Sequence, residues 1–572
     1  MTLQELAPKP GDDLIGAPDA LGGSATGYLR HAALAVFLAW LAIVWAWPGA
    51  VFFLTFDDSF YYLEIARNLA AGDGPTFDRI NPTNGFHPLW LALVAPAFAF
   101  GLDGLDAVRV LLTVQLGLWF GALCLVAGLI APPRAASAGD RHRGALAQAL
   151  VLAVVAGNPY VVKTFVNGME SAVYLACYAI LLWQSCRIGG RWLGATSRST
   201  RLAMAVVASY AFLARSDAGL VILALGCWCL PEAYRMGARG LVRLAELFVM
   251  PAAVIVLFLW VNGVVFDSPL QVSGELKRLP LSASGLMIFA ACAALPALGI
   301  WRLKARAARR GGPAGVAFPR LAGLLGSSGW FAVACGLLVG YYVGLQAFPR
   351  LWYFGPVVFY GLVLLLAGAA DLAESVLGEA QPRARLRLLN GVLIAPLAVM
   401  LAVEAWRAAD PRTVSIRIAD QAAGEWISGN LPADAVVGSW DAGVVAYFAR
   451  QRVINLDGFV NSTAYARALN DGTAGALLND QGLAYLVNHD VIEDGEATTL
   501  RAMAAGLLGA DRAAGLTLLK VFPFTFAGSA NRLPRGVHEM ATFVYELSMP
   551  APEMRERRQP DAPPDDIPTV IF

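Results

Sequence analysis

Two adjacent carboxylates, Asp57 and Asp58, follow the first long apolar stretch of the chain, in the run TFDDSFYY. Apolar residues recur at helical spacing over 59–71, so one aspartate can cap this predicted helix by accepting a backbone N–H bond. That interpretation leaves the neighbouring carboxylate without a structural task. A carboxylate beside a hydroxyl-bearing acceptor can act as a general base and remove the proton as the new bond forms.

The polar loop that opens at this acidic pair continues through the run NPTNGFHP at 81–88. Asn-Pro and Asn-Gly are turn-forming pairs, so two turns account for the loop structurally. His87 can contact a phosphate or make a structural hydrogen bond, and both interpretations stay open. Tyr61 and Asn84 are the candidate contacts for an acceptor in this region.

Four further ionisable residues lie at the ends of apolar stretches. Glu170 is favourable at a helix start by the helix dipole alone, yet across a cavity it could bind acceptor hydroxyls. Arg215 has an acid two residues on that can neutralise it. Lys277 and Arg350 can extend their charges to a membrane surface. Three cations near one surface also suit a lipid phosphate, because arginine offers a planar fork of donors.

Composition places these residues in a membrane protein. The chain is 57% hydrophobic and 15% charged, with a mean hydropathy of +0.57, which excludes an ordinary soluble protein. The net charge of +1 gives no electrostatic reason to expect nucleic acid. All seven cysteines fall in apolar stretches, so they indicate small buried side chains, not a disulfide framework or a metal cluster.

The elements that position the candidate residues are apolar stretches long enough to span a bilayer. They are predicted at about 32–54, 107–131, 145–163, 170–186, 246–262, 285–301, 321–347, 353–370 and 388–406. Five intervening loops are rich in arginine, and the positive-inside rule places them in the cytoplasm: 132–144, 187–202, 231–243, 302–320 and 371–387.

This assignment fixes the parity of the crossings. Segment 203–230 must cross twice, as a helical hairpin broken near Arg215, and only 107–131 can cross between the acidic loop and 132–144. The apolar segment 89–100 is then too short to span and dips or lies at the interface. The count is about eleven spans, and the unusual polar residues converge on one external face, where ionisable groups favour function.

Four regions follow from these patterns. Residues 1–30 are predicted to be a disordered cytoplasmic N-terminus, and 31–407 to be a helical membrane domain whose first external loop is 55–106. Residues 408–550 alternate helical and strand patterns, which predicts an external α/β domain. Residues 551–572 are predicted to be a disordered tail.

Together these residues resemble the GT-C superfamily of membrane-embedded glycosyltransferases, which use polyprenyl-phosphate sugars and carry an acidic pair in the first external loop. The likeness covers about residues 32–370 in motif order, at Asp57-Asp58, the aromatic helix 60–71, His87-Pro88-Leu89-Trp90, Gly168-Met169-Glu170, 213–219 and 350–356. The nearest branch is the arabinofuranosyltransferases that use decaprenyl-phospho-arabinose. The run Arg215-Ser216-Asp217 departs from the Arg-Pro-Asp of that family.

The resemblance implies an inverting transfer to an extracytoplasmic glycan, lipid or protein acceptor, at the outer face of a bacterial inner membrane. The roles it implies are a general base at Asp57 or Asp58, donor phosphate binding at Arg215, Lys277, Arg350 and His87, and acceptor binding at Glu170, Tyr61 and Asn84. The use of a divalent cation stays open, because two carboxylates can hold Mg²⁺ or Mn²⁺ with water completing the shell.

Two other classes of function remain. A transporter or flippase for a lipid-linked or anionic substrate would also place Arg and Asp in the membrane profile. Transporters, however, usually show matching broken helices in two halves, and this chain shows one broken hairpin. A scaffold for envelope assembly would make the acidic pair dispensable.

Overall fold

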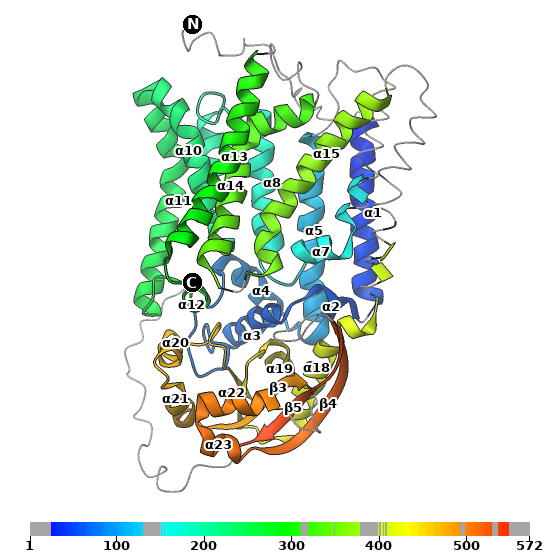
Figure 1. The fold of residues 1–572 in the computed structure, drawn as a ribbon, viewed down its shortest axis with the longest axis vertical. Coiled ribbons are helices and arrows are strands. Elements are labelled where there is room, and N and C mark those ends of the chain that lie inside the picture. The colour runs from blue at the N-terminus through cyan, green and yellow to red at the C-terminus, as the bar shows by residue number, and fades with distance from the viewer. Residues whose placement is uncertain are drawn as a thin grey trace.

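The computed structural model describes residues 24–47, 49–129, 149, 151–153, 155–309, 318–347, 349–377, 399, 402–403, 405–406, 409–491, 498–528 and 536–547. Two layers are visible in Figure 1: a bundle of long helices, and a smaller α/β domain below it that is formed by the C-terminal part of the chain. Short helices lie between the two layers.

The bundle consists of long, apolar helices. Seven of the described helical segments are long and apolar enough to cross a membrane: Leu29–Ala46, Gly104–Val126, Ala218–Met236, Ala238–Val265, Ala283–Arg306, Pro319–Leu345 and Leu351–Ala369. They belong to α1 (Ser24–Ala46), α5 (Gly104–Leu129), α10 (Ala218–Met236), α11 (Ala238–Val265), α13 (Ala283–Arg309), α14 (Pro319–Leu345) and η3–α15 (Leu351–Phe354, Gly355–Leu377). Two helices of 17 residues, α8 (Ser171–Arg187) and α9 (Arg198–Ala214), pack among them.

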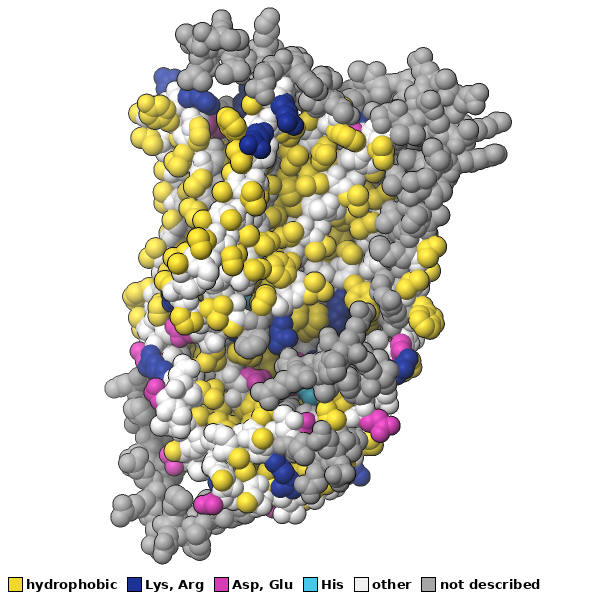
Figure 2. All heavy atoms as spheres, viewed as in Figure 1, with side chains coloured by type: hydrophobic (Ala, Val, Ile, Leu, Met, Phe, Trp, Pro, Cys, Tyr) yellow, Lys and Arg dark blue, Asp and Glu magenta, His cyan; other side chains and the backbone are white. Residues whose placement is uncertain are grey.

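The side surface of the bundle is apolar, as contact with the core of a bilayer requires. Figure 2 shows hydrophobic side chains over the side of the bundle, with basic ones gathered at its upper end and both signs of charge where the bundle meets the lower domain. Large apolar residues of α11, such as Val256 and Trp260, are well exposed on the surface. The chain is therefore an integral membrane protein. Most of the predicted span 388–406 lies outside the described residues, whereas 145–163 is described at 149, 151–153 and 155–163.

Two boundaries differ from the sequence-based expectations, and one predicted break is confirmed. Helix α1 begins at Ser24, so the last residues of the segment predicted to be disordered are helical, and Leu29 is already buried against the bundle. The stretch 32–54 is two helices, α1 and α2 (Gly49–Leu54), because proline at position 48 cannot continue a helix. The predicted break near Arg215 is present, between α9 and α10.

Helix α4 (Pro88–Ala99) settles how the apolar segment 89–100 is arranged. Twelve residues span about 18 Å as a helix, which is shorter than the apolar core of a bilayer of about 30 Å. The helix packs against α3 (Asp57–Ala71), α5 and α9, at the end of the bundle that faces the C-terminal domain (Figure 1). It is therefore not a span.

The C-terminal domain is built on one five-stranded sheet with the order β2-β1-β3-β5-β4. Strands β1 (Val436–Ser439), β2 (Arg452–Asn455) and β3 (Leu483–Val491) pair in parallel, whereas β5 (Gly536–Glu546) is antiparallel to both β3 and β4 (Thr517–Gly528). The remaining elements are η5 (Pro411–Thr413), α18 (Ser415–Asn430), α19 (Gly443–Phe448), α20 (Thr463–Asn470), α21 (Ala474–Asp480), α22 (Thr498–Leu508) and α23 (Ala510–Ala514). The predicted C-terminal α/β domain is thus present as a mixed α/β fold.

The parallel strands end toward the bundle. Asp441 follows β1 and Asp457 follows β2, and the turn after β1 leads into α19, which packs against α3. In open α/β sheets the carboxyl ends of parallel strands are where ligands bind. This edge of the C-terminal domain therefore faces the polar loops at the end of the bundle.

Candidate active site

A cavity of about 400 Å³ lies where the bundle meets the C-terminal domain. Its lining contains six of the residues singled out from the sequence: Asp58, Tyr61, His87, Glu170, Arg215 and Lys277. They come from α3, the loop before α4, the start of α8, the break between α9 and α10, and the end of α12 (Val272–Leu276). The convergence predicted from the topology is therefore present in the fold.

The two adjacent aspartates diverge because they start a helix. Successive helical residues point about 100° apart, at 3.6 residues per turn. Asp58 lines the cavity, is half-buried and has no hydrogen-bond partner among the described residues. Asp57 is not among the cavity-lining residues and turns toward the C-terminal domain.

Asp57 joins α3 to the C-terminal domain. Its Oδ2 accepts a hydrogen bond from the backbone N–H of Gly443 (2.8 Å), and its Oδ1 accepts one from that of Val444 (3.0 Å). Arg417 of α18 donates to the same Oδ1 at 3.1 Å. Burial raises the pKa of Asp57 to about 6, partly offset by the charge of Arg417, while nearby Asp441 raises it further. The prediction that one of the pair caps its own helix is wrong, because α3 starts at Asp57 and its N-cap residue is Phe56. Asp57 instead caps α19, a helix of the C-terminal domain.

Glu170 is held by a tightly fastened loop. Gly168 has a φ of +77°, and a Cβ there would lie 2.8 Å from the Cβ of Ser59, so glycine is required on both counts. The side-chain oxygen of Gln115 accepts hydrogen bonds from the backbone N–H groups of Asn167 (3.1 Å) and Gly168 (2.9 Å). Ser59 donates to the Asn167 carbonyl at 2.5 Å. The loop therefore fixes Glu170 opposite the first turn of α3.

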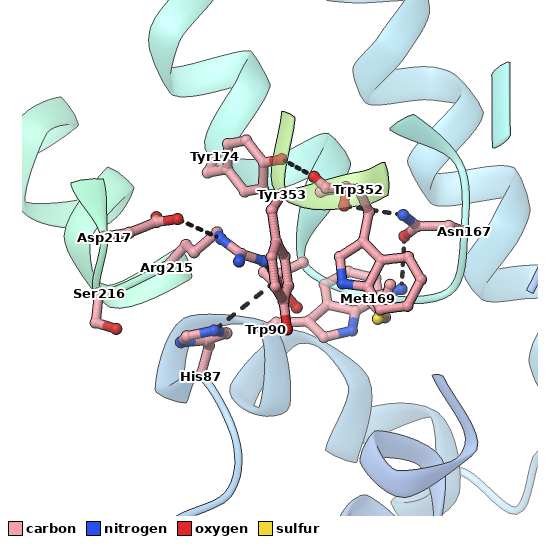
Figure 3. A network of polar contacts seen from close by, with 12 residues as sticks. His87, Trp90, Asn167, Met169, Tyr174, Arg215, Ser216, Asp217, Trp352 and Tyr353 are labelled. Carbon is pink, nitrogen blue, oxygen red and sulfur yellow. Dashed lines mark hydrogen bonds and ion pairs between the residues drawn. The ribbon is translucent and has the colours of Figure 1, made fainter. Parts of the chain in front are cut away.

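Arg215 lies in a cage of acidic and aromatic side chains (Figure 3). Its Nη1 donates to Glu170 at 2.5 Å, its Nε to Asp217 at 2.8 Å and its Nη2 to the Tyr342 hydroxyl at 2.9 Å. Tyr342 donates in turn to Asp217, and the ring of Tyr353 lies 4.9 Å from the guanidinium carbon. Three of its five N–H donors are therefore occupied, and the two carboxylates outweigh its charge.

His87 and Lys277 complete the polar part of the cavity. His87 Nε2 lies 3.8 Å from Glu170, and its Nδ1 lies 3.0 Å from the Gln271 amide nitrogen. Burial lowers the pKa of His87 against the opposing charge of Glu170, so the ring acts mainly as a neutral hydrogen-bonding group. Lys277 donates to the Tyr353 hydroxyl at 3.1 Å and lies 4.2 Å from the centre of the Phe459 ring.

Besides Asp57, two residues chosen from the sequence do not line the cavity. Asn84 is buried and saturated: its amide donates to Asn262 (3.2 Å) and to the Leu270 carbonyl (2.9 Å), and it accepts from the Val272 N–H (2.9 Å). It clamps its loop onto the α11–α12 connection. Arg350 is exposed, and its positive charge helps to lower the pKa of Asp441 in the C-terminal domain.

The C-terminal domain contributes ionisable residues that the sequence analysis did not select. Asp441 lies 3.2 Å from His489. Burial would raise the pKa of Asp441, but the hydrogen bond and charge of His489, with Arg417, outweigh it and lower the pKa to about 2. Burial, reinforced by Asp441, Asp57 and Asp58, raises the pKa of Asp457 well above its usual value. Each acid lies two residues after the end of a parallel strand, β1 or β2, and this position after an apolar, strand-like run is the signal that could have identified them.

The acidic pair does not form a chelating site for one metal ion. Both oxygens of Asp57 accept hydrogen bonds from the C-terminal domain, and Asp58 points elsewhere. Within the described parts of the chain, no group of three or more His, Cys, Asp or Glu side chains is arranged to hold a metal. The interpretation in which Asp57 and Asp58 together bind Mg²⁺ or Mn²⁺ does not fit this geometry.

Comparisons with known proteins give remote likenesses. Residues 409–545 match a family model described as a domain of unknown function, DUF8728. No curated protein matches the chain. Oligosaccharyltransferase AglB from Archaeoglobus fulgidus, solved with an inhibitory peptide and a dolichol-phosphate, is similar at 13% identity and a TM-score of 0.47, over 90% of this chain and 76% of that one. ArnT from Cupriavidus metallidurans in the apo state is similar at 14% identity and a TM-score of 0.46, over 91% and 98%. Likenesses this distant carry no inference about activity.

Proposed function

We propose that this membrane protein is a glycosyltransferase of the GT-C type, which moves a sugar from a polyprenyl-phosphate donor to an acceptor hydroxyl or amide with inversion at the anomeric carbon. One observation carries the proposal. A half-buried carboxylate without a partner among the described residues, Asp58, lines the same cavity as Lys277 and an apolar wall of the bundle. The cavity thus offers a base, a cation and a path for a lipid chain.

The apolar wall suits the lipid part of the donor. It is formed by α9, α10 and α11 and contains Phe212, Leu220, Ile255, Phe258 and Leu259. The other face of α11 is exposed on the surface of the bundle, where lipid would surround it. A prenyl chain lying along this wall would bring its phosphate to the level of Lys277, at the polar end of the cavity.

Lys277 is the cation best placed to meet that phosphate. It makes one hydrogen bond, to Tyr353, among the described residues, which leaves two of its three N–H donors. Arg215 has two N–H donors remaining after its three bonds, so it can contribute while Glu170 and Asp217 hold it in place. We assign no phosphate contact to Arg350, which is exposed and acts on Asp441.

The proposed reaction is a single displacement. The acceptor oxygen or nitrogen forms its bond to the anomeric carbon while the bond from that carbon to the phosphate oxygen breaks. The proton of the acceptor passes to a carboxylate oxygen of Asp58, and the electron pair of the broken bond leaves with the lipid phosphate. The barrier is lowered by holding donor and acceptor in line and by placing Lys277 where negative charge develops.

The acceptor would approach from the side of the C-terminal domain. Phe459 and Val460, which follow β2, line the cavity beside Asp58 and Tyr61. We infer that this domain faces the exterior of a bacterial inner membrane, since the arginine-rich segments 187–202 and 231–243, which the structure describes, lie at the other end of the bundle. The motif likeness makes arabinofuranose the first sugar to test and an envelope glycan the first acceptor.

The test compares full-length protein in lipid nanodiscs with a panel of polyprenyl-phosphate sugars, including decaprenyl-phospho-arabinose, in Mg²⁺-containing buffer. The readout is release of free lipid phosphate. We expect Asp58→Asn to lower turnover by about 10²- to 10⁴-fold, the usual contribution of a general base, with donor binding retained. The matched control is Asp73→Asn, an exposed acid in the same loop.

Two results would contradict the proposal. Turnover by Asp58→Asn at the wild-type rate would remove this residue as the base. Donor translocation across the membrane without release of lipid phosphate would instead establish a flippase or transporter.

A further inference from the structure

A second polar pocket, of about 420 Å³, lies apart from the catalytic cavity and shares none of its described lining residues. We call it the arginine pocket. It is formed by the second half of α3, the start of α5 and the turn between α19 and β2, and it is lined by Glu64, Arg67, Asn68, Arg79, Asp103, Gly104, Tyr447, Phe448, Ala449 and Arg450. None of these residues has a part in the proposed transfer reaction.

The pocket lies at the level of lipid headgroups. Gly104, which lines it, is the first residue of a candidate membrane span. Just before that span, Phe98 lies 5.8 Å from the Arg67 guanidinium carbon, and Phe100 is 86% exposed. Tyrosine, here Tyr447 in the pocket lining, is enriched where a membrane protein meets the lipid–water interface. A ligand in the pocket would therefore be at the membrane surface on the side of the C-terminal domain.

The pocket holds more positive than negative charge. Its three guanidinium groups, from Arg67, Arg79 and Arg450, face two carboxyl groups, from Glu64 and Asp103. Arginine is well suited to phosphate because its planar fork of donors matches two phosphate oxygens at once.

Part of this donor capacity is unused. Arg67 donates to Glu64 and Asp103, at 2.6 Å each, and to the Tyr447 carbonyl at 2.9 Å, but its buried Nε has no hydrogen-bond partner. Arg79 adopts a left-handed φ of +60° and directs its Nη2 to the carbonyls of Arg450 (2.9 Å) and Gln451 (2.8 Å). The exposed Arg450 guanidinium makes no hydrogen bond to any residue that the structure describes.

We propose that the arginine pocket binds the phosphate group of an anionic lipid in the leaflet next to the C-terminal domain. The bound phosphate would bridge α3 and α5 of the membrane part to the α19–β2 turn of the C-terminal domain. It would thereby hold the domain against the membrane at a second point, separate from the contacts of Asp57. Arg450 supplies the main donor, because binding there breaks no existing hydrogen bond.

The protonation state of Glu64 should make the affinity for the lipid depend on pH. Burial raises the pKa of Glu64 to about 7, against the lowering charges of Arg67 and Arg79, and Asp103 raises it further. An ionised Glu64 repels phosphate, whereas the neutral acid does not. Binding of the lipid should therefore strengthen as the pH falls from 8 to 6.

The test measures lipid binding to the full-length protein by native mass spectrometry and by thermal shift in neutral detergent. Phosphatidylglycerol, phosphatidylcholine and soluble glycerol phosphate are titrated separately. We expect preferential binding of phosphatidylglycerol and a weakening by roughly 10- to 100-fold in Arg450→Gln, the range for a hydrogen bond to a charged group. The control is Arg452→Gln, which removes an exposed arginine two residues away and outside the pocket.

Each outcome decides the question. Binding of phosphatidylglycerol that is lost in Arg450→Gln, but kept in Arg452→Gln, supports the proposal. Equal binding of glycerol phosphate retains the phosphate site but overturns the lipid source. Equal affinity of both variants for phosphatidylglycerol, or equal binding of phosphatidylcholine and phosphatidylglycerol to the wild type, would overturn the proposal.

Discussion

The Arg215 cage predicts a strong dependence of stability on paired charges. Arg215→Gln removes the cation from between Glu170 and Asp217. Glu170 is 2% exposed, so its carboxylate would remain buried with only the Tyr62 hydroxyl (2.9 Å) and His87 nearby. Removing one partner of a buried ion pair costs about 3–5 kcal/mol, because the other charge is left uncompensated. We expect a loss of unfolding free energy in that range.

A double variant separates this penalty from the role of Arg215 in catalysis. Arg215→Gln combined with Glu170→Gln leaves no unpaired Glu170 charge, so much of the stability should return, while turnover stays low because the donor phosphate has lost a cation. Unfolding free energies are measured by denaturant titration in mixed micelles, and turnover by release of lipid phosphate. The control is Arg198→Gln, which removes an exposed arginine that pairs with Glu246 (3.2 Å). It should cost no more than about 1 kcal/mol, because Glu246 keeps its ion pair with Arg201 (2.6 Å).

The reasoning fails on either of two results. A loss for Arg215→Gln no larger than that of the Arg198→Gln control would show that Glu170 finds another partner. A double variant no more stable than Arg215→Gln would show that the cage is not held together by the pairing of these charges.

Two further predictions concern the elements around the cavity. The pKa of Asp57 is raised in the fold from 3.8 to about 6, so the folded state favours the protonated carboxyl. The stabilisation from this proton is complete below pH 3.8 and is lost as the pH rises through 6. The total loss is about 3 kcal/mol, at 1.36 kcal/mol per pKa unit. Unfolding curves at pH 5 and 7.5 should differ by less in Asp57→Asn than in wild type, and an equal difference in both would exclude Asp57 as a source. Gly168→Ala should reduce turnover and destabilise the protein by roughly 1–3 kcal/mol through its φ of +77° and the contact with Ser59. The control is Gly189→Ala, where φ is +59° and no atom lies within 4 Å of the new Cβ. If Gly168→Ala loses no more unfolding free energy than this control, the contact with Ser59 does not contribute.

Much of the fold was predictable because membrane spans leave simple signals. Apolar length, arginine-rich loops and parity predicted the helical bundle and the break at Arg215. They also predicted that Asp58, Glu170 and Lys277 would meet at one end of the bundle, because alternate crossings bring alternate loops to the same side. These are arguments from order along the chain, which the sequence contains directly.

The contacts between the two domains were not predictable in the same way. Which of Asp57 and Asp58 faces the cavity depends on where α3 starts, and the bonds of Asp57 to α19 join residues that are far apart in the sequence. Asn84 looks like a turn residue in the sequence, but in the fold it clamps two loops together. Asp457 approaches the acidic pair only through the parallel pairing of β1 and β2, a long-range contact without a local signal.

The divergence of Asp57 and Asp58 limits how this part of the chain can vary. Inserting one residue into the first turn of α3 would rotate everything beyond it by about 100°. Asp58, the proposed base, and Asp57, which binds the C-terminal domain, could then no longer both keep their directions. Insertions and deletions near α3 are therefore compatible with both contacts only in the loops on either side of the helix. The positions of the two aspartates along this one helix thus couple the docking of the C-terminal domain to the proposed reaction.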